Sequence, residues 1–133
     1  MLHSLCNLSS RLLDNREGAL APVTGFADKL CHASLLDGIT LSRAKHLRYA
    51  HQNLSQLAQL AEKNSGALIV TESVFSMEGD ISPRDKMASL CHSHHTPLFV
   101  DDAHGFGVLG QTGLGALDHW KVITKKPDIL SFS

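Results

Sequence analysis

Helical and extended apolar patterns alternate along the chain. Between residues 53 and 64 apolar side chains recur every three or four positions, and Asn53 can cap the helix that this spacing predicts. The short apolar run ALIVTE, 67–72, follows Gly66 and indicates a buried strand. The other elements that the pattern predicts are helices at 32–41, at 83–94 and after Gly115, and strands at 98–101 and 128–133.

The order of these elements predicts the topology. A strand, a helix, a second strand and a connection to a third strand form the βαβ pattern, in which helices cover a parallel sheet. We therefore predict an α/β fold with a mainly parallel sheet flanked by helices. Residues 1–27 are weakly organised, because helical spacing at Leu5, Leu8 and Leu12 is followed by glycine and proline.

Composition narrows the class of protein. The 133 residues are 43% apolar and 19% charged, which is typical of one soluble globular domain. The net charge is −1 with histidine neutral, so neither nucleic acid nor an anionic membrane is an expected partner. Three distant cysteines, Cys6, Cys31 and Cys91, are typical of reduced thiols. Signal-peptide and membrane-spanning patterns are absent, so we expect a cytoplasmic protein.

Polar residues lie at the ends of two of the predicted strands. The strand 67–72 ends at Glu72, with Ser76 just beyond, and the strand 98–101 ends at Asp101, with His104 beyond. Parallel strands end at the same edge of a sheet, where ligands of α/β proteins bind. A carboxylate there is partly desolvated and needs a cationic or hydrogen-bonding partner, such as the protonated ring nitrogen of pyridoxal phosphate. Spacing alone leaves a solvated loop as an equal alternative.

Other motifs are open to two interpretations. His92, His94 and His95 of CHSHH suggest a metal site, but no second ligand cluster accompanies them, so a solvated helix end is favoured. The run GFGVLGQTGLG lacks the Gly-Lys-Ser/Thr ending of a phosphate loop, and its glycines instead favour tight turns. His32 is either a packed side chain or a ring that stacks on a flat cofactor.

Three motifs occur together in one order. They are HASLLDG at 32–38, TESVFSMEGD at 71–80 and VDDAHGFGVLG at 100–110. Together they resemble the α-oxoamine synthases, which are pyridoxal-phosphate enzymes of the aspartate aminotransferase fold type. The resemblance runs from about Asp28 to the end of the sequence. It implies a partial large domain over 28–133, an unmatched segment at 1–27 and no C-terminal small domain.

The resemblance also implies roles for individual residues. Asp101 would pair with the pyridine nitrogen of the cofactor, with Asp102 as its neighbour on the other face of the strand. His104 would hydrogen-bond the phenolic oxygen, and Ser76 would lie near the same atom. His32 would stack on the ring. Ser133 occupies a position near the cofactor phosphate in the family.

The implied reaction condenses L-alanine with a pimeloyl thioester of CoA or acyl carrier protein, with loss of CO2, in biotin biosynthesis. Members of the family are homodimers. Another branch, 2-amino-3-ketobutyrate ligase, is an alternative. The lysine that forms the Schiff base lies about three residues beyond the position of Ser133 in the family. We therefore expect the isolated chain to be inactive, and a non-catalytic fragment is the second functional hypothesis.

Overall fold

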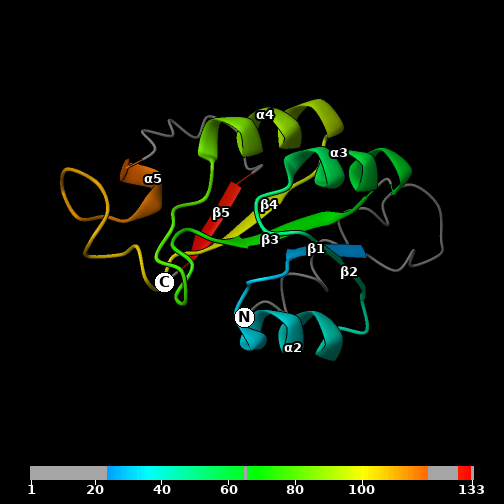
Figure 1. Cartoon of the computed structure of the whole chain (residues 1–133), viewed down its shortest axis with the longest axis horizontal. Helices are drawn as coiled ribbons and strands as arrows, with labels where there is room; N and C mark the ends of the chain where they lie inside the picture. Colours follow the sequence, from blue (N-terminus) through cyan, green and yellow to red (C-terminus); the bar gives the residue numbers. More distant parts are fainter. Residues whose placement is uncertain (1–23, 65, 120–128, 133) are drawn as a thin grey trace.

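The computed structural model describes residues 24–64, 66–119 and 129–132, and Figure 1 shows their arrangement. Five strands form one parallel sheet in the order β2-β1-β3-β4-β5. The predicted parallel α/β fold is therefore confirmed. The elements are β1 (Thr24–Asp28), α2 (Ala33–Leu41), β2 (Lys45–Tyr49), α3 (Leu54–Lys63), β3 (Leu68–Glu72), α4 (Arg84–His94), β4 (Leu98–Asp101), α5 (Ala116–His119) and β5 (Ile129–Phe132).

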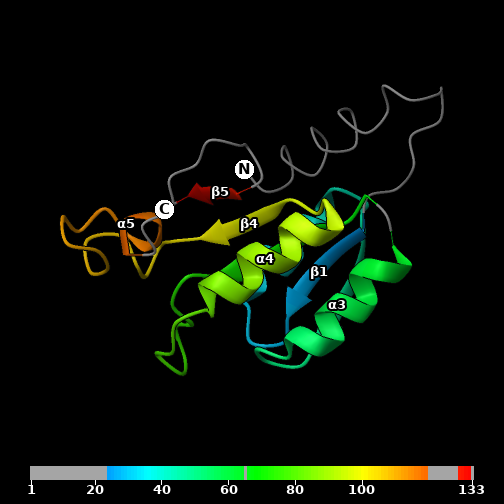
Figure 2. The same ribbon diagram turned by 90° about the horizontal axis from the view of Figure 1, so that it is seen from above.

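Helices cover both faces of the sheet (Figures 1 and 2). On one face α2 packs Leu35 and Ile39 against Val70 and Phe99 of the sheet. On the other face α3 and α4 lie beside each other, and their apolar stripes form a second cluster with the sheet. This cluster includes Leu57, Ala61, Met87, Leu90, Phe26, Ile69 and Val100. The two clusters explain why β3, buried on both faces, is apolar along its first three residues.

The predicted local elements agree with the structure, caps included. The side chain of Asn53 accepts a hydrogen bond from the Gln56 N–H at 3.0 Å, as a helix cap should. Pro83 precedes the first turn of α4, and His95 ends that helix in the left-handed region with φ 50°. The helical spacing at Leu5, Leu8 and Leu12 lies outside the described residues.

The sequence pattern did not predict two strands, β1 and β2. The edge strand β2 has the sequence KHLRY and exposes most of its side chains, so it lacks an apolar pattern. In β1, Gly25 interrupts the apolar pattern of a strand, and the packing of α2 explains why a glycine stands there. A Cβ on Gly25 would lie 3.1 Å from Cδ1 of Ile39, so α2 approaches this strand closely.

The parallel arrangement brings the carboxyl ends of β1, β3 and β4 to one edge. β3 and β4 are paired so that Glu72 lies opposite Asp101. The loops that leave this edge contain the motifs singled out in the sequence. Among the described helices, none is both long enough and apolar enough to span a bilayer.

Candidate functional site

The ends of β3 and β4 form the centre of the candidate site. Glu72 and Asp101 are register neighbours, and the Ser73 N–H donates to the Asp101 carbonyl at 2.9 Å. The Glu72 carboxylate also accepts a short hydrogen bond from the backbone N–H of His32, which follows β1. A continuous set of contacts therefore links His32, Glu72 and Asp101 along this edge of the sheet.

The two adjacent aspartates have different environments. Asp101 is half-buried, and its Oδ1 accepts the Ala103 N–H at 3.0 Å. No described residue hydrogen-bonds its second oxygen, which is therefore able to accept from a ligand. Asp102 is only 3% exposed, and its Oδ2 accepts the Ala116 N–H at 2.7 Å. Oδ1 of Asp102 has no hydrogen-bond partner among the described residues, but it is buried, so Asp101 is the carboxylate that a ligand can reach.

Two glycines make room for the Asp102 carboxylate. A Cβ on Gly105 would lie 2.1 Å from Oδ1, and a Cβ on Gly115 would lie 2.0 Å from Oδ2. Gly115 also has φ +89°, a conformation that side chains disfavour. These contacts explain the glycines of this run, because the loop folds tightly around the buried Asp102 carboxylate. The expectation that its glycines permit tight turns is thereby met.

His32 caps helix α2 with its own ring. Nδ1 accepts the Ser34 N–H at 3.2 Å and lies 2.8 Å from the Ser34 hydroxyl oxygen. A backbone N–H can only donate, so Nδ1 carries the lone pair and the ring proton is on Nε2. The residue is exposed, in contrast to the packed histidine that the sequence left as an alternative. The ring is therefore held in one tautomer at the surface.

Ser76 and His104 are also exposed, in the loops that follow β3 and β4. Within the described part of the chain, no hydrogen bond joins the side chains of His32, Ser76, Asp101 and His104 to one another. The four share the carboxyl edge of the sheet without direct bonding. Ser133 lies outside the described residues.

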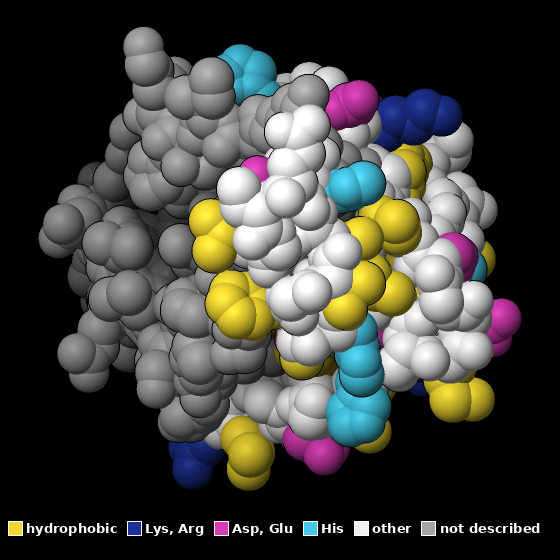
Figure 3. Space-filling model, turned by 90° about the vertical axis from the view of Figure 1, so that its left-hand side faces the viewer, with side chains coloured by type: hydrophobic (Ala, Val, Ile, Leu, Met, Phe, Trp, Pro, Cys, Tyr) yellow, Lys and Arg dark blue, Asp and Glu magenta, His cyan; other side chains and the backbone are white. Residues whose placement is uncertain are grey.

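The face that carries the β4–α5 loop has hydrophobic side chains beside histidines (Figure 3). Phe106, Val108 and Leu114 of this loop are 55%, 75% and 63% exposed.

The histidines of the CHSHH motif lie at the end of α4, where His92 and His95 are exposed and His94 is partly buried. Among the residues that the structure describes, no group of three histidine, cysteine or acidic residues could hold a metal ion.

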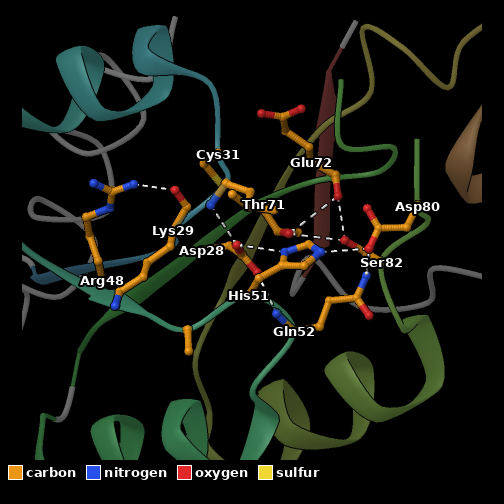
Figure 4. Close-up of polar contacts among 12 residues, drawn as sticks. Asp28, Lys29, Cys31, Arg48, His51, Gln52, Thr71, Glu72, Asp80 and Ser82 are labelled. Carbon is orange, nitrogen blue, oxygen red and sulfur yellow. Dashed lines mark hydrogen bonds and ion pairs between the residues drawn. The ribbon is translucent and has the colours of Figure 1, made fainter. Parts of the chain in front are cut away.

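Several buried or half-buried polar groups lie in this region, and sequence reasoning missed Asp28 and His51 among them (Figure 4). Glu72 is 2% exposed, and its Oε2 has no hydrogen-bond partner among the described residues. Asp28 at the end of β1 is 1% exposed and lies 3.0 Å from the ring of His51. The missed strand β1 explains the missed Asp28, because no strand end was expected there. Glu72 was expected at this edge because it ends a predicted strand, but its unpartnered oxygen was not expected.

The acids of this region also act on a neighbouring thiol. Burial raises the pKa of Cys31 to about 12, and the charges of Asp28 and Glu72 act in the same direction. Its Sγ donates to the Val70 carbonyl at 3.7 Å. Cys31 is thus a protonated packing residue.

Comparison with known proteins places this arrangement in a family. The profile of aminotransferase class I and II matches residues 24–131. A putative 8-amino-7-oxononanoate synthase from Methanococcus vannielii is 50% identical over 99 residues, which are 72% of this chain and 26% of the relative. The 8-amino-7-oxononanoate synthase of an Azoarcus species is 51% identical over 105 residues, which are 74% of this chain and 27% of the relative.

Solved structures agree with these relatives. The 8-amino-7-oxononanoate synthase of Francisella tularensis is 41% identical, with a TM-score of 0.68 over 91% of this chain and 33% of its own. A serine palmitoyltransferase of S. paucimobilis, solved with bound PLP, is 27% identical, with a TM-score of 0.71 over 90% of this chain and 29% of its own. The fold is thus part of an aspartate-aminotransferase-like domain. The chain spans about a quarter of the length of the curated relatives it matches.

Proposed function

Because the chain belongs to the aminotransferase class I and II family, we propose that it supplies part of the pyridoxal-phosphate site of an 8-amino-7-oxononanoate synthase. The proposed reaction condenses L-alanine with a pimeloyl thioester of CoA or acyl carrier protein and releases CO2, in biotin biosynthesis. The proposed complete protein is a cytoplasmic homodimer. The similarity to named synthases at about 50% identity supports this choice over 2-amino-3-ketobutyrate ligase.

One observation carries the proposal: Asp101 is half-buried and its second oxygen has no partner among the described residues, whereas Asp102 is only 3% exposed and its unpartnered Oδ1 is buried. The residues present therefore fit pyridoxal phosphate, whose ring nitrogen needs an ionised acid beside it. When bound, this cofactor withdraws the negative charge that develops on the α-carbon of an amino acid. The role of Asp101 is to accept the hydrogen bond from the ring nitrogen and keep that nitrogen protonated.

The remaining residues orient the ring. His104 and Ser76 would donate hydrogen bonds to the phenolic oxygen, and both are exposed at the correct edge of the sheet. His32 would stack on the ring face. Its backbone is tied to Glu72 and its Nδ1 to Ser34, so its position is set before any ligand arrives. We assign Ser133, by resemblance alone, to the cofactor phosphate.

The 133-residue chain is proposed to bind the cofactor without a covalent bond and without turnover. In the resembling family the amine that forms the Schiff base follows the position of Ser133. Lys121, Lys125 and Lys126 precede the last strand and are not assigned this role. A fragment that only binds cofactor is therefore the proposed behaviour of this polypeptide when it is tested alone.

The test is a titration of the purified chain with pyridoxal phosphate, followed by cofactor fluorescence, with folding checked by circular dichroism. Asp101→Asn should weaken binding by about tenfold to a hundredfold, because a hydrogen bond to a charged group is lost. Asp37→Asn, a matched change at an exposed acid of α2, should leave the affinity unchanged. Equal affinities for the original chain and Asp101→Asn would refute the role of Asp101. Stoichiometric labelling of a lysine after borohydride reduction would refute non-covalent binding.

A further inference from the structure

The imidazole of His51 joins three segments that are distant in sequence (Figure 4). His51 lies between β2 and α3. Its Nδ1 is 3.0 Å from Oδ1 of Asp28, at the end of β1. Its Nε2 is 2.6 Å from Oδ2 of Asp80, in the loop 73–82 between β3 and α4. The ring also meets Phe75 of that loop edge-on, with centroids 4.5 Å apart and planes at 90°.

The hydrogen bonds around the ring determine its protonation. Oδ1 of Asp28 also accepts the Leu30 N–H at 2.9 Å, and Oδ2 accepts the Gln52 N–H at 2.8 Å. Both oxygens of Asp28 thus face donors, as those of an ionised carboxylate do. Oδ2 of Asp80 likewise accepts the Gln52 Nε2–H at 2.9 Å. Each nitrogen of His51 faces a carboxylate oxygen, so both nitrogens must donate and the ring carries a proton on each.

The charges around the ring favour this state. Burial opposes a charge on His51, but the hydrogen bonds to Asp80 and Asp28 outweigh burial and raise its pKa. The charged groups that face the ring are Asp28 from β1 and Asp80 from the loop, and Gln52 is neutral. Tyr49, which is close enough to Asp28 to feel its charge, stays neutral because burial raises its pKa. A cation between two anions is the arrangement that these groups stabilise.

The loop that His51 contacts is the one that carries Ser76. Its backbone is closed by hydrogen bonds from the Phe75 N–H to the Asp80 carbonyl at 3.0 Å and from the Gly79 N–H to the Phe75 carbonyl at 2.7 Å. Phe75 and Asp80 stand on either side of Ser76, and both contact His51. The ring of His51 therefore contacts this turn on both sides of Ser76.

We propose that doubly protonated His51 is a positioning residue that fastens loop 73–82 to the end of β1 and thereby places Ser76 at the cofactor site. The assignment of a cofactor to Ser76 rests on the proposed function, whereas the fastening concerns only residues of this chain. A histidine whose pKa is raised by folding holds its partners below that pKa and releases one as the pH rises through it. The loop should accordingly loosen on the alkaline side of the His51 titration.

The experiment follows the histidine rings and the amides of the full 133-residue chain by NMR as a function of pH, without cofactor. Both ring nitrogens of His51 should carry protons above about pH 6.5, the ordinary midpoint of histidine. The amide signals of Ser76 and Gly79 should shift with the same midpoint as His51. Asp80→Asn should lower that midpoint, because it removes one of the two charges.

Two variants distinguish the placement of loop 73–82 by His51 from a general loss of stability. In His51→Gln the pH step at Ser76 and Gly79 should disappear, and exchange of the Gly79 amide should speed up by about tenfold or more. His46→Gln, at an exposed site of β2, should change neither. If His51→Gln does not fold, the original chain and Asp80→Asn still decide the question. A His51 ring that is already neutral at about pH 6.5, a midpoint that Asp80→Asn leaves unchanged, or loop amides that do not shift at the His51 midpoint would overturn the proposal.

A separate measurement distinguishes this proposal from the proposed function. The affinity for pyridoxal phosphate is compared between the original chain and His51→Gln, below and above the His51 midpoint. Weaker binding above the midpoint in the original chain, and no such step in His51→Gln, supports the link to Ser76. Absence of binding at every pH would refute the proposed function and with it the link, while the NMR titration still decides whether His51 fastens the loop.

Discussion

Asp28→Asn should destabilise the chain far more than Asp101→Asn, although both acids end parallel strands. The buried carboxylate of Asp28 accepts hydrogen bonds from Leu30, Gln52 and His51 at 2.9, 2.8 and 3.0 Å. An asparagine has one acceptor oxygen and one NH2 group. In either orientation the NH2 group faces a backbone N–H, so at least one partly buried donor loses its partner.

The expected loss of unfolding free energy follows from these contacts. An unsatisfied buried donor costs about 1–3 kcal/mol, and the lost charge beside protonated His51 adds to this. We expect Asp28→Asn to lower the free energy of unfolding by about 2–3 kcal/mol. Asp101 is half-buried and accepts one hydrogen bond, from Ala103, which an asparagine oxygen can keep. Asp101→Asn should therefore change stability by less than about 0.5 kcal/mol.

The assay is urea unfolding at about pH 7, followed by far-ultraviolet circular dichroism. The original chain and the two variants are compared under the same conditions. If Asp28→Asn unfolds within about 0.5 kcal/mol of the original chain, the account of β1 and His51 is wrong. Equal destabilisation by the two substitutions would contradict the division between a structural and an available acid.

Three further predictions concern stability and reactivity. Gly115→Ala should cost at least about 2 kcal/mol in urea unfolding, because its Cβ would meet Asp102 at 2.0 Å. Gly107→Ala has a similar φ of +82° but open space around the Cβ, so only backbone strain of roughly 1–2 kcal/mol is expected; a larger loss there than at Gly115 would contradict the packing argument. Cys31 should react with iodoacetamide only after unfolding, since burial raises its pKa to about 12, and rapid labelling of the folded chain would disprove this. Asn53→Ala should lose about 1 kcal/mol through the missing cap of α3, and unchanged stability would count against that cap.

The parts of the fold that local patterns determine were predictable. The apolar spacing and cap of α3 lie within one short stretch, and the apolar run of β3 is continuous. β2 was not predictable in this way, because KHLRY is a strand only through its pairing with β1 at the sheet edge. β1 itself needed knowledge that Ile39 would pack on Gly25. β1 and β2 therefore form through contacts with distant segments, which a local sequence pattern does not contain.

In the candidate site, too, some features followed from the local sequence and others depended on distant contacts. That Glu72 and Asp101 share an edge followed from parallel strands and needed no coordinates. Which of two adjacent aspartates remains available depended on the burial of Asp102 and on its hydrogen bond from Ala116, the first residue of α5. The environment of His51 required three separate segments to meet, which no spacing in the sequence indicates.

The most direct test concerns the ring nitrogen that Asp101 is proposed to hold. The chain is loaded with pyridoxal phosphate labelled with nitrogen-15 in the ring, and the chemical shift of that nitrogen is measured by NMR. The account predicts a protonated ring nitrogen in the original chain and an unprotonated one in folded Asp101→Asn. An unprotonated nitrogen in the original chain, or a protonated nitrogen that Asp101→Asn leaves unchanged, would contradict it.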